Sequence, residues 1–168
     1  LAPKDGLRYA HDFWTDPATG MLLKARSLTE RGEVVEQFAF SDLAIGAKLD
    51  RDAARPTWSD LPAGWQEKQT KFGAREIVDT GWAVLKLPPG FVKIMEGRRG
   101  VRDRPDALAQ IVFSDGLVAI SVFIEQRGGR QRSVGRARMG NINQYSIKQD
   151  DYMITALGEV PAETVRML

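Results

Sequence analysis

The segment formed by residues 107–125 constrains the fold more than any other part of this 168-residue chain. It holds two apolar, β-rich runs on either side of Asp115-Gly116, a dipeptide that favours a tight hairpin turn of type I′. The returning run is apolar on both faces, with Ile124 on one face and Phe123 on the other. A strand that is apolar on both faces is usually covered on both sides. The pattern therefore predicts that this hairpin lies at the centre of a sheet.

Three further strands, joined by tight turns, are predicted near the start of the chain, at residues 7–14, 21–28 and 33–42. The connection between the first two contains Pro17 and ends at Gly20, which is typical turn chemistry. Three strands with a partly apolar face need a further surface to pack on. We therefore expect their unpaired edges to pair with a second copy, giving a homo-oligomer, or with the C-terminal part of the chain.

The C-terminal part has a mostly β pattern that ends in a helix. Pro161 suits the first turn of a helix, and Val165 and Leu168 are spaced to face a sheet. An arginine-rich loop is expected at residues 97–104. The fold class is therefore predicted to be α+β and mainly antiparallel. Besides the central hairpin, the strands expected in this part are residues 82–87, 91–96, 131–139, 143–148 and 152–157.

A change in composition near the middle of the chain predicts its domain plan. Residues 44–75 contain two prolines, many charges and few apolar clusters, which is typical of a linker. The exceptions are Trp58 and Trp65, which we expect to fix the linker against a neighbouring domain. The expected plan is a β domain at 1–43, the linker, and an α+β domain at 76–168.

Composition limits the class of protein. A hydrophobic content of 43% is ordinary for a globular protein and argues against global disorder. No apolar run approaches the roughly 20 residues needed to span a bilayer. The first residues show neither an initiator Met nor a cleavable signal pattern, so the chain reads as a mature piece or an internal fragment.

The sequence offers no convincing catalytic or metal-binding constellation. Cysteine is absent, which excludes disulfides, thiolate metal sites and cysteine nucleophiles. His11 is the single histidine, and Ser114 sits in a turn without the flanking glycines of a nucleophile elbow. Asp150-Asp151 lacks the further oxygen ligands of a cation loop. The glycine-containing segments 97–100 and 128–130 lack the context of phosphate loops. We expect no catalytic residue, no metal and no cofactor, and infer a binding protein.

Arginines are concentrated in one region and are the candidate binding residues. Residues 98–138 hold nine arginines, no lysine and four acidic residues, a local net charge of +5. Arginine suits bidentate recognition of carboxylates or phosphates, although a solvated sheet face and loop would explain the same bias. The candidate partner-binding residues are Arg98, Arg99, Arg102, Arg104, Arg130, Arg132, Arg136 and Arg138.

A nucleic-acid partner is not favoured. Aromatic residues such as Trp82 and Phe113 fall within apolar strand patterns, which indicates that they belong to the core. No aromatic residue alternates with the arginines in the manner of a base-stacking surface.

Five segments, in order along nearly the whole chain, resemble the MucB/RseB family. Residues 14–24 (WTDPATGMLLK) resemble its "W-x-D-x-x-T-G-L-L-L-K/R" hairpin, and residues 32–38 are similar to the strand after it. Residues 87–91 (LPPGF) resemble the family's "L-P-x-G-F" corner. Residues 113–117 (FSDGL) resemble its "Y-S-D-G-L" hairpin, and residues 154–161 are similar to its "T-V-I-G-E-L-P" stretch.

The resemblance implies a fold, a compartment and a function. It implies that residues 7–42 are the closing strands of an open barrel like that of the lipoprotein carriers LolA and LolB, followed by a sheet-plus-helix domain. It implies a periplasmic, non-enzymatic regulator that binds the periplasmic part of a membrane-spanning anti-sigma factor (RseA or MucA). That binding would protect the anti-sigma factor from proteolysis and so restrain sigma-E signalling. Lipopolysaccharide or lipoprotein acyl chains are implied as further ligands.

Two alternatives remain open at the level of sequence. The first is a lipid or lipoprotein carrier module without a signalling role, which would not need the C-terminal domain. The second is an enzyme of unknown type, which would need catalytic residues that the sequence does not display.

Overall fold

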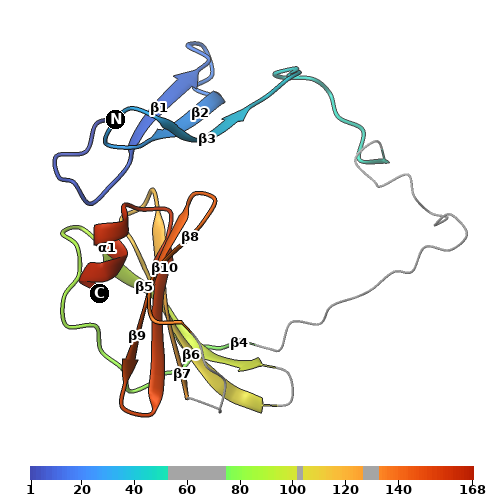
Figure 1. The fold of residues 1–168 in the computed structure, drawn as a ribbon. Helices are drawn as coiled ribbons and strands as arrows, with labels where there is room; N and C mark the ends of the chain where they lie inside the picture. The colour runs from blue at the N-terminus through green and yellow to red at the C-terminus, as the bar shows by residue number, and fades with distance from the viewer. Residues whose placement is uncertain (53–74, 102–103, 127–132) are drawn as a thin grey trace, which may run out of the picture. The chain divides into compact units, whose positions relative to one another are not determined.

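A computed structural model describes residues 1–52, 75–101, 104–126 and 133–168 of the chain. It contains a three-stranded sheet, a seven-stranded sheet and one short helix (Figure 1). Every strand pair is antiparallel, which confirms the predicted α+β, mainly β class. Within the described ranges, no helix is long and apolar enough to cross a membrane.

The three-stranded sheet is formed by β1 (Ala10–Thr15), β2 (Leu22–Leu28) and β3 (Val34–Ala39), in that order. This confirms the three predicted strands, with shorter boundaries. The turn between β1 and β2 is closed by the Asp16 carboxylate, which accepts hydrogen bonds from the backbone N–H and the hydroxyl of Thr19, both at 2.7 Å. Those hydrogen bonds hold the pKa of Asp16 below its usual range, because they favour the ionised carboxylate.

The seven-stranded sheet contains the hairpin of residues 107–125, as β6 and β7. Strand β7 is the middle strand, which confirms the prediction of a central hairpin. In spatial order the strands are β4 (Arg75–Glu76), β5 (Val92–Val101), β6 (Arg104–Ser114), β7 (Ala119–Gln126), β10 (Tyr152–Gly158), β9 (Ile142–Gln149) and β8 (Gly135–Met139).

The predicted type I′ turn of the β6–β7 hairpin is wrong. A four-residue loop joins Ser114 to Ala119, and within it only Gly116 has a positive φ, +96°. The Asp115 carboxylate accepts hydrogen bonds from the backbone N–H groups of Leu117 and Val118, at 3.0 and 3.1 Å. These bonds stabilise a wider loop, so the turn does not need two consecutive residues with positive φ.

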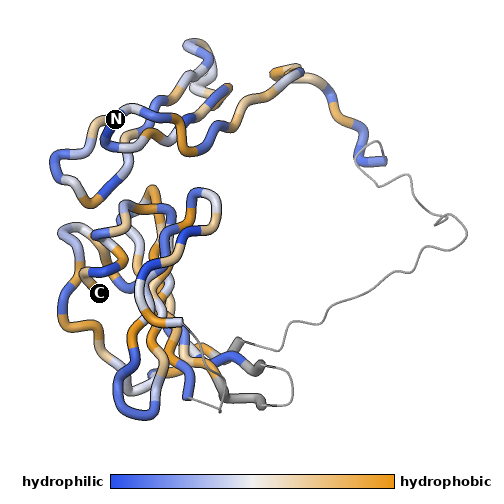
Figure 2. The backbone as a smooth tube through the Cα atoms, viewed as in Figure 1, coloured by the Kyte–Doolittle hydropathy of each residue, from blue (hydrophilic) through white to orange (hydrophobic). Residues whose placement is uncertain are grey.

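The core lies on one face of the seven-stranded sheet, under the helix α1 (Ala162–Met167). Val165 is buried in this core and Leu168 packs against it, as the sequence predicted. Figure 2 shows hydrophobic stretches on the strands of this sheet, alternating with hydrophilic ones. The buried members of the core are Phe91, Ala109, Ile111, Phe113, Ile120, Val122, Ile124, Ala156, Val160 and Val165.

The strand expected at residues 82–87 does not form. Residues 77–90, here called the strap, contain no strand and lie on the helix side of the sheet (Figure 1). Trp82 packs edge-on against Tyr152, with ring centroids 4.9 Å apart, while Leu85 is 98% exposed. The alternating apolar pattern is therefore explained by packing of alternate side chains on a sheet face, without pairing of the backbone.

The arginine-rich segment 97–104 is also different from the prediction of a loop. Strand β5 continues to Val101 and β6 begins at Arg104, so most of the segment is paired strand. The strands expected at 131–139, 143–148 and 152–157 are present as β8, β9 and β10 with shifted ends, while residues 131 and 132 lie outside the described residues.

The described chain divides into two compact units, Leu1–Ala39 with Gly73–Leu168, and Phe40–Phe72. The described part of the second unit, residues 40–52, contains neither strand nor α-helix. Trp58 and Trp65 lie outside the described residues. The division into 1–43, 44–75 and 76–168 therefore stays a prediction.

Candidate interaction surface

The candidate arginines fall on separate parts of the seven-stranded sheet. Arg98 and Arg99 lie on β5, next to one edge of the sheet, whereas Arg136 and Arg138 lie on β8 at the opposite edge. Arg104 is the first residue of β6. The remaining three, Arg102, Arg130 and Arg132, lie outside the described residues.

On β5, Arg98 has a structural contact. Its Nη2 donates a hydrogen bond to the backbone carbonyl of Thr80 in the strap, at 3.1 Å, and the side chain is part-buried. Arg98 therefore helps to hold the strap on the sheet.

On β8, the arginines are exposed and form a cationic patch with α1. Arg136 pairs with Glu163 at 2.5 Å, and Arg166 pairs with the same carboxylate at 3.3 Å. Arg138 donates from Nε to the carbonyl of Gly140 at 2.8 Å. We call these four side chains, Arg136, Arg138, Glu163 and Arg166, the β8 patch. Three cations and one anion give it an excess positive charge, which suits an acidic ligand.

The local register explains why two arginines of β8 point the same way. Arg136 lies opposite Tyr145, and Arg138 lies opposite Asn143. Side chains two positions apart on a strand share a face, so both arginines project toward the side that carries α1. The ion pair between Arg136 and Glu163 is consistent with that direction.

The other chemical candidates have structural roles. The His11 ring stacks on Phe13, with centroids 5.8 Å apart, and its Nδ1 lies 3.3 Å from Ser27 Oγ. Ser114 Oγ donates to the carbonyl of Val118 at 2.8 Å and so braces the hairpin loop. Asp150, with φ +51°, occupies the turn between β9 and β10. No group of three or more residues suited to holding a metal ion occurs among the described residues.

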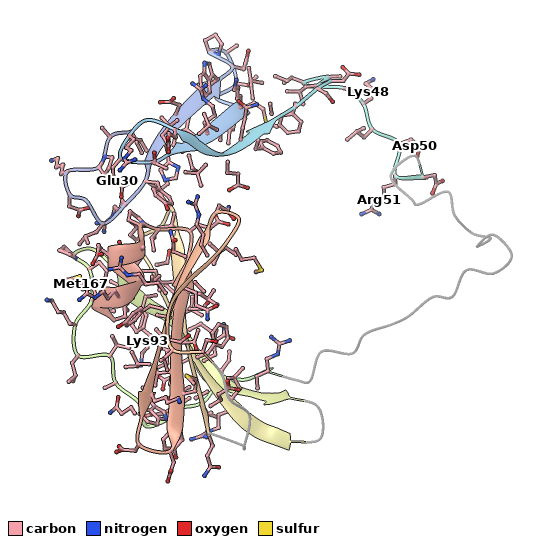
Figure 3. All side chains as sticks on the ribbon, viewed as in Figure 1. Glu30, Lys48, Asp50, Arg51, Lys93 and Met167 are labelled. Carbon is pink, nitrogen blue, oxygen red and sulfur yellow. The ribbon has the colours of Figure 1, made fainter. Side chains whose placement is uncertain are left out.

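Sequence reasoning missed a buried carboxylate, Glu96, on β5. Its Oε1 accepts hydrogen bonds from the backbone N–H and the hydroxyl of Thr80, at 2.7 and 2.6 Å. Lys93 Nζ lies 2.5 Å from Oε2 (Figure 3, which labels Lys93). The hydrogen bond from Lys93, followed by those from Thr80, lowers the pKa of Glu96 to about 2. This carboxylate therefore fixes the strap to β5 in its ionised form.

A second missed cluster lies on the three-stranded sheet. Lys24 Nζ and Arg26 Cζ lie 4.8 and 4.7 Å from the ring centroid of Trp14, which is cation–π geometry. Arg26 also pairs with Asp12 at 3.2 Å. The register places these side chains on one face, because Trp14 lies opposite Lys24 and Asp12 opposite Arg26.

Among the described residues, each face of the seven-stranded sheet carries a cavity. One, of about 240 Å³, lies between the strap and the core face, with mainly apolar walls that include Trp82, Ile124 and Ile154 and with Lys86 also in its lining. The other, of about 420 Å³, is on the opposite face and mixes apolar with hydroxyl and amide side chains, among them Phe123 and Ser146.

Comparison with known proteins identifies the family. The MucB/RseB N-terminal domain matches residues 1–58, and the MucB/RseB C-terminal domain matches residues 76–168. The chain is 33% identical to the sigma factor AlgU regulatory protein MucB of Pseudomonas aeruginosa over 98% of its length. It is 28% identical to the sigma-E factor regulatory protein RseB of Salmonella typhimurium over its full length.

A similar solved structure supports the same family. The complex of MucA and MucB from Pseudomonas aeruginosa superposes with a TM-score of 0.77, at 30% identity, over 98% of this chain and 54% of that chain. The chain spans about half the length of the curated relatives, 51% in each case. With both domain models matched in order, this chain belongs to the MucB/RseB family.

Proposed function

We propose that this chain is part of a non-enzymatic, periplasmic regulator that binds the periplasmic part of a MucA- or RseA-like anti-sigma factor. Binding protects the anti-sigma factor from proteolysis and so restrains sigma-E signalling. The observation that carries the proposal is the likeness of nearly the whole chain, with a TM-score of 0.77, to MucB in its complex with MucA.

The candidate arginines are proposed to supply part of the binding surface. Among those described, Arg136 and Arg138 are the strongest, because both are exposed and project from a strand at the edge of the sheet. An acidic, extended segment would gain charge-assisted hydrogen bonds to their guanidinium groups. Arg98 is a weaker candidate, since its side chain already binds the strap.

The test measures binding of the full chain to the purified periplasmic domain of the anti-sigma factor from the same genome. We expect saturable binding, and slower cleavage of that domain by the site-one protease when the chain is present. Reversing Arg136 and Arg138 to Glu should weaken binding at least about tenfold. Arg31→Glu, in the exposed turn between β2 and β3, is the matched control. An unchanged affinity in the double variant removes these two residues from the proposal, and absence of binding by the unaltered chain refutes the function itself.

A lipid or lipoprotein carrier is the second candidate. The apolar cavity of about 240 Å³ under the strap favours it, because such a space suits part of an acyl chain of lipopolysaccharide or lipoprotein. A fluorescent fatty-acid probe, titrated against the chain with and without the anti-sigma domain, separates the two functions. Probe binding without any anti-sigma binding supports the carrier.

Self-association through the three-stranded sheet is proposed as a separate property. Several large apolar side chains of this part are exposed, among them Phe13, Val34 and Phe38. Burying such side chains against a second copy would be favourable. Light scattering over a concentration series tests this, and a strictly monomeric mass at all concentrations would contradict it.

A further inference from the structure

A short segment ahead of β1, residues 5–9, lies against side chains of the C-terminal region. We call it the anchor segment. Arg8 is its centre: Nε lies 2.7 Å from Asp115 Oδ2, and Nη1 lies 2.6 Å from Asp5 Oδ2. The guanidinium also sits over the ring of Phe91, 5.0 Å from its centroid, and donates to the carbonyl of Pro89. One side chain of the anchor segment thus contacts the β6–β7 loop, the residue just before β5 and the strap.

The residue after Arg8 is fixed by a buried amide. Tyr9 is 7% exposed, and its hydroxyl accepts a hydrogen bond of 2.9 Å from Nδ2 of Asn143 on β9. The same Nδ2 donates to the carbonyl of Val160 at 2.8 Å. Asn143 therefore joins the anchor segment to the residues that lead into α1.

The residue before Arg8 is held by the helix. Thr164, a fully buried residue of α1, donates from its hydroxyl to the carbonyl of Leu7 at 2.8 Å. Three successive residues of the anchor segment are therefore bound by three different parts of the C-terminal region. Buried hydrogen bonds and a partly buried ion pair are specific contacts, because each unmatched polar group would carry a desolvation penalty.

Two features of the C-terminal region favour its contacts with the anchor segment. Burial would raise the pKa of Asp115, but hydrogen bonds from Leu117, Val118 and Arg8 together lower it, so the carboxylate stays charged. Gly90 has φ +83°, and a Cβ there would lie 3.3 Å from Nη2 of Arg8. The glycine therefore serves both the backbone turn and the close approach of the guanidinium.

We infer that the C-terminal region carries a receptor site for the anchor segment, and that occupancy of this site couples the β1–β3 sheet to the seven-stranded sheet. The receptor consists of Pro89, Phe91, Asp115, Asn143 and Thr164, and it fits a turn segment with adjacent Arg and Tyr side chains. The family models place residues 1–58 and 76–168 in different domains, so the anchor crosses that division. Loss of the anchor contacts would let the two sheets move independently.

Distance measurement tests the coupling directly. The chain has no cysteine, so Arg31→Cys and Asp151→Cys give two unique sites for spin labels in exposed turns. We expect a single narrow distance distribution in the otherwise unaltered chain and a clearly broader one after Arg8→Ala or Asp115→Asn. Lys148→Ala, an exposed substitution on β9, is the control and should leave the distribution narrow. A narrow distribution that survives both anchor substitutions overturns the inference.

Hydrogen exchange of the full chain supplies a second readout that also reports folding. In Arg8→Ala we expect amides of residues 7–11 to exchange at least about tenfold faster, while β6 and β7 remain protected. The double variant Arg8→Ala/Asp115→Asn should exchange no faster than Arg8→Ala alone, because the contact that Asp115→Asn weakens is already lost in Arg8→Ala. Additive effects of the two substitutions would contradict a shared contact.

A competing peptide tests the receptor site itself. A synthetic peptide of residues 3–10, added in excess, should broaden the distance distribution of the unaltered chain, whereas the same peptide with Arg8→Ala should not. An equal effect of both peptides would show that the site does not recognise the arginine, and no effect of either would refute an exchangeable receptor site.

Discussion

The Nε atom of Arg8 lies 2.7 Å from Oδ2 of Asp115, although 107 positions separate the two residues in the chain. The other carboxylate oxygen, Oδ1, accepts the backbone hydrogen bonds of Leu117 and Val118. The Asp115 side chain therefore closes the loop between β6 and β7 and also binds the anchor segment, which precedes β1.

These two roles of Asp115 can be separated by substitution. Asp115→Asn keeps an oxygen for the loop but loses the charge that binds Arg8, and should lower the free energy of unfolding by about 1 kcal/mol. Asp115→Ala removes both the oxygen that binds the loop and the charge that binds Arg8, and should lower the free energy of unfolding by about 2–3 kcal/mol. Urea denaturation measures the difference, with the exposed Asp151→Asn as control. Equal losses for the two Asp115 variants would show that the loop contact contributes nothing.

Glu96 should make stability depend on pH in the acid range. Its pKa in the folded protein, about 2, is lower than the ordinary value of 4.5, so its contribution is fully present above pH 4.5 and is lost as the pH falls toward 2. Glu96→Gln should therefore destabilise the chain by about 1–3 kcal/mol at pH 7, and the difference from the unaltered chain should shrink toward zero near pH 2. Chemical denaturation at pH 7 and at pH 3 checks this. A difference that stays constant with pH would exclude an ionic role for Glu96.

Gly158, the last residue of β10, is predicted to tolerate no side chain. A Cβ there would lie 2.8 Å from the carbonyl oxygen of Ala119 and 3.3 Å from the Cα of Ile120, both backbone atoms that cannot move aside easily. We expect Gly158→Ala to lower the free energy of unfolding by about 1–3 kcal/mol. Gly6→Ala is the matched control, because nothing lies within 4 Å of a Cβ at that position. Equal stability of the two variants would contradict the close approach at Gly158.

The core and the strap should respond differently to truncation. Ile120 is fully buried, so Ile120→Ala should cost about 2–5 kcal/mol through lost transfer energy and the cavity that remains. Leu85, which is 98% exposed, should change stability by no more than about 0.5 kcal/mol when replaced by Ala. Thermal and urea unfolding of both variants test this contrast. A large loss of stability in Leu85→Ala would mean that another part of the protein or a second copy covers the strap.

Local sequence patterns were sufficient to predict most of the β-strands. The run that contains Ile120 and Ile124 predicted a central strand, and β7 is the middle strand of its sheet. The positions of Pro161 and Val165 predicted a helix that packs on the core, which α1 does. Such signals work because side-chain periodicity and turn chemistry act over a few residues.

The predictions of a strand at 82–87 and of a loop at 97–104 were wrong because the local sequence pattern fits more than one structure. The apolar pattern of residues 82–87 fits a paired strand as well as an unpaired strap whose alternate side chains pack on a sheet face. The hydrogen bonds from Thr80 to Glu96 favour the strap. The arginines near Arg98 indicated an exposed loop, but the backbone there is paired with β6. The contacts that decide both cases come from neighbouring strands and cannot be read from the local sequence.

The sequence by itself determined where most of the strands lie along the chain, the central hairpin, the closing helix and the family, because each is encoded by short-range periodicity or by motifs in order. Only the tertiary structure decided that Asp115 binds Arg8, that Asn143 binds Tyr9, and that Arg98 and Arg136 lie near opposite edges of one sheet. Electrostatic and hydrogen-bonding energies depend on distance in space, and that distance is set by strand pairing between residues far apart in the chain.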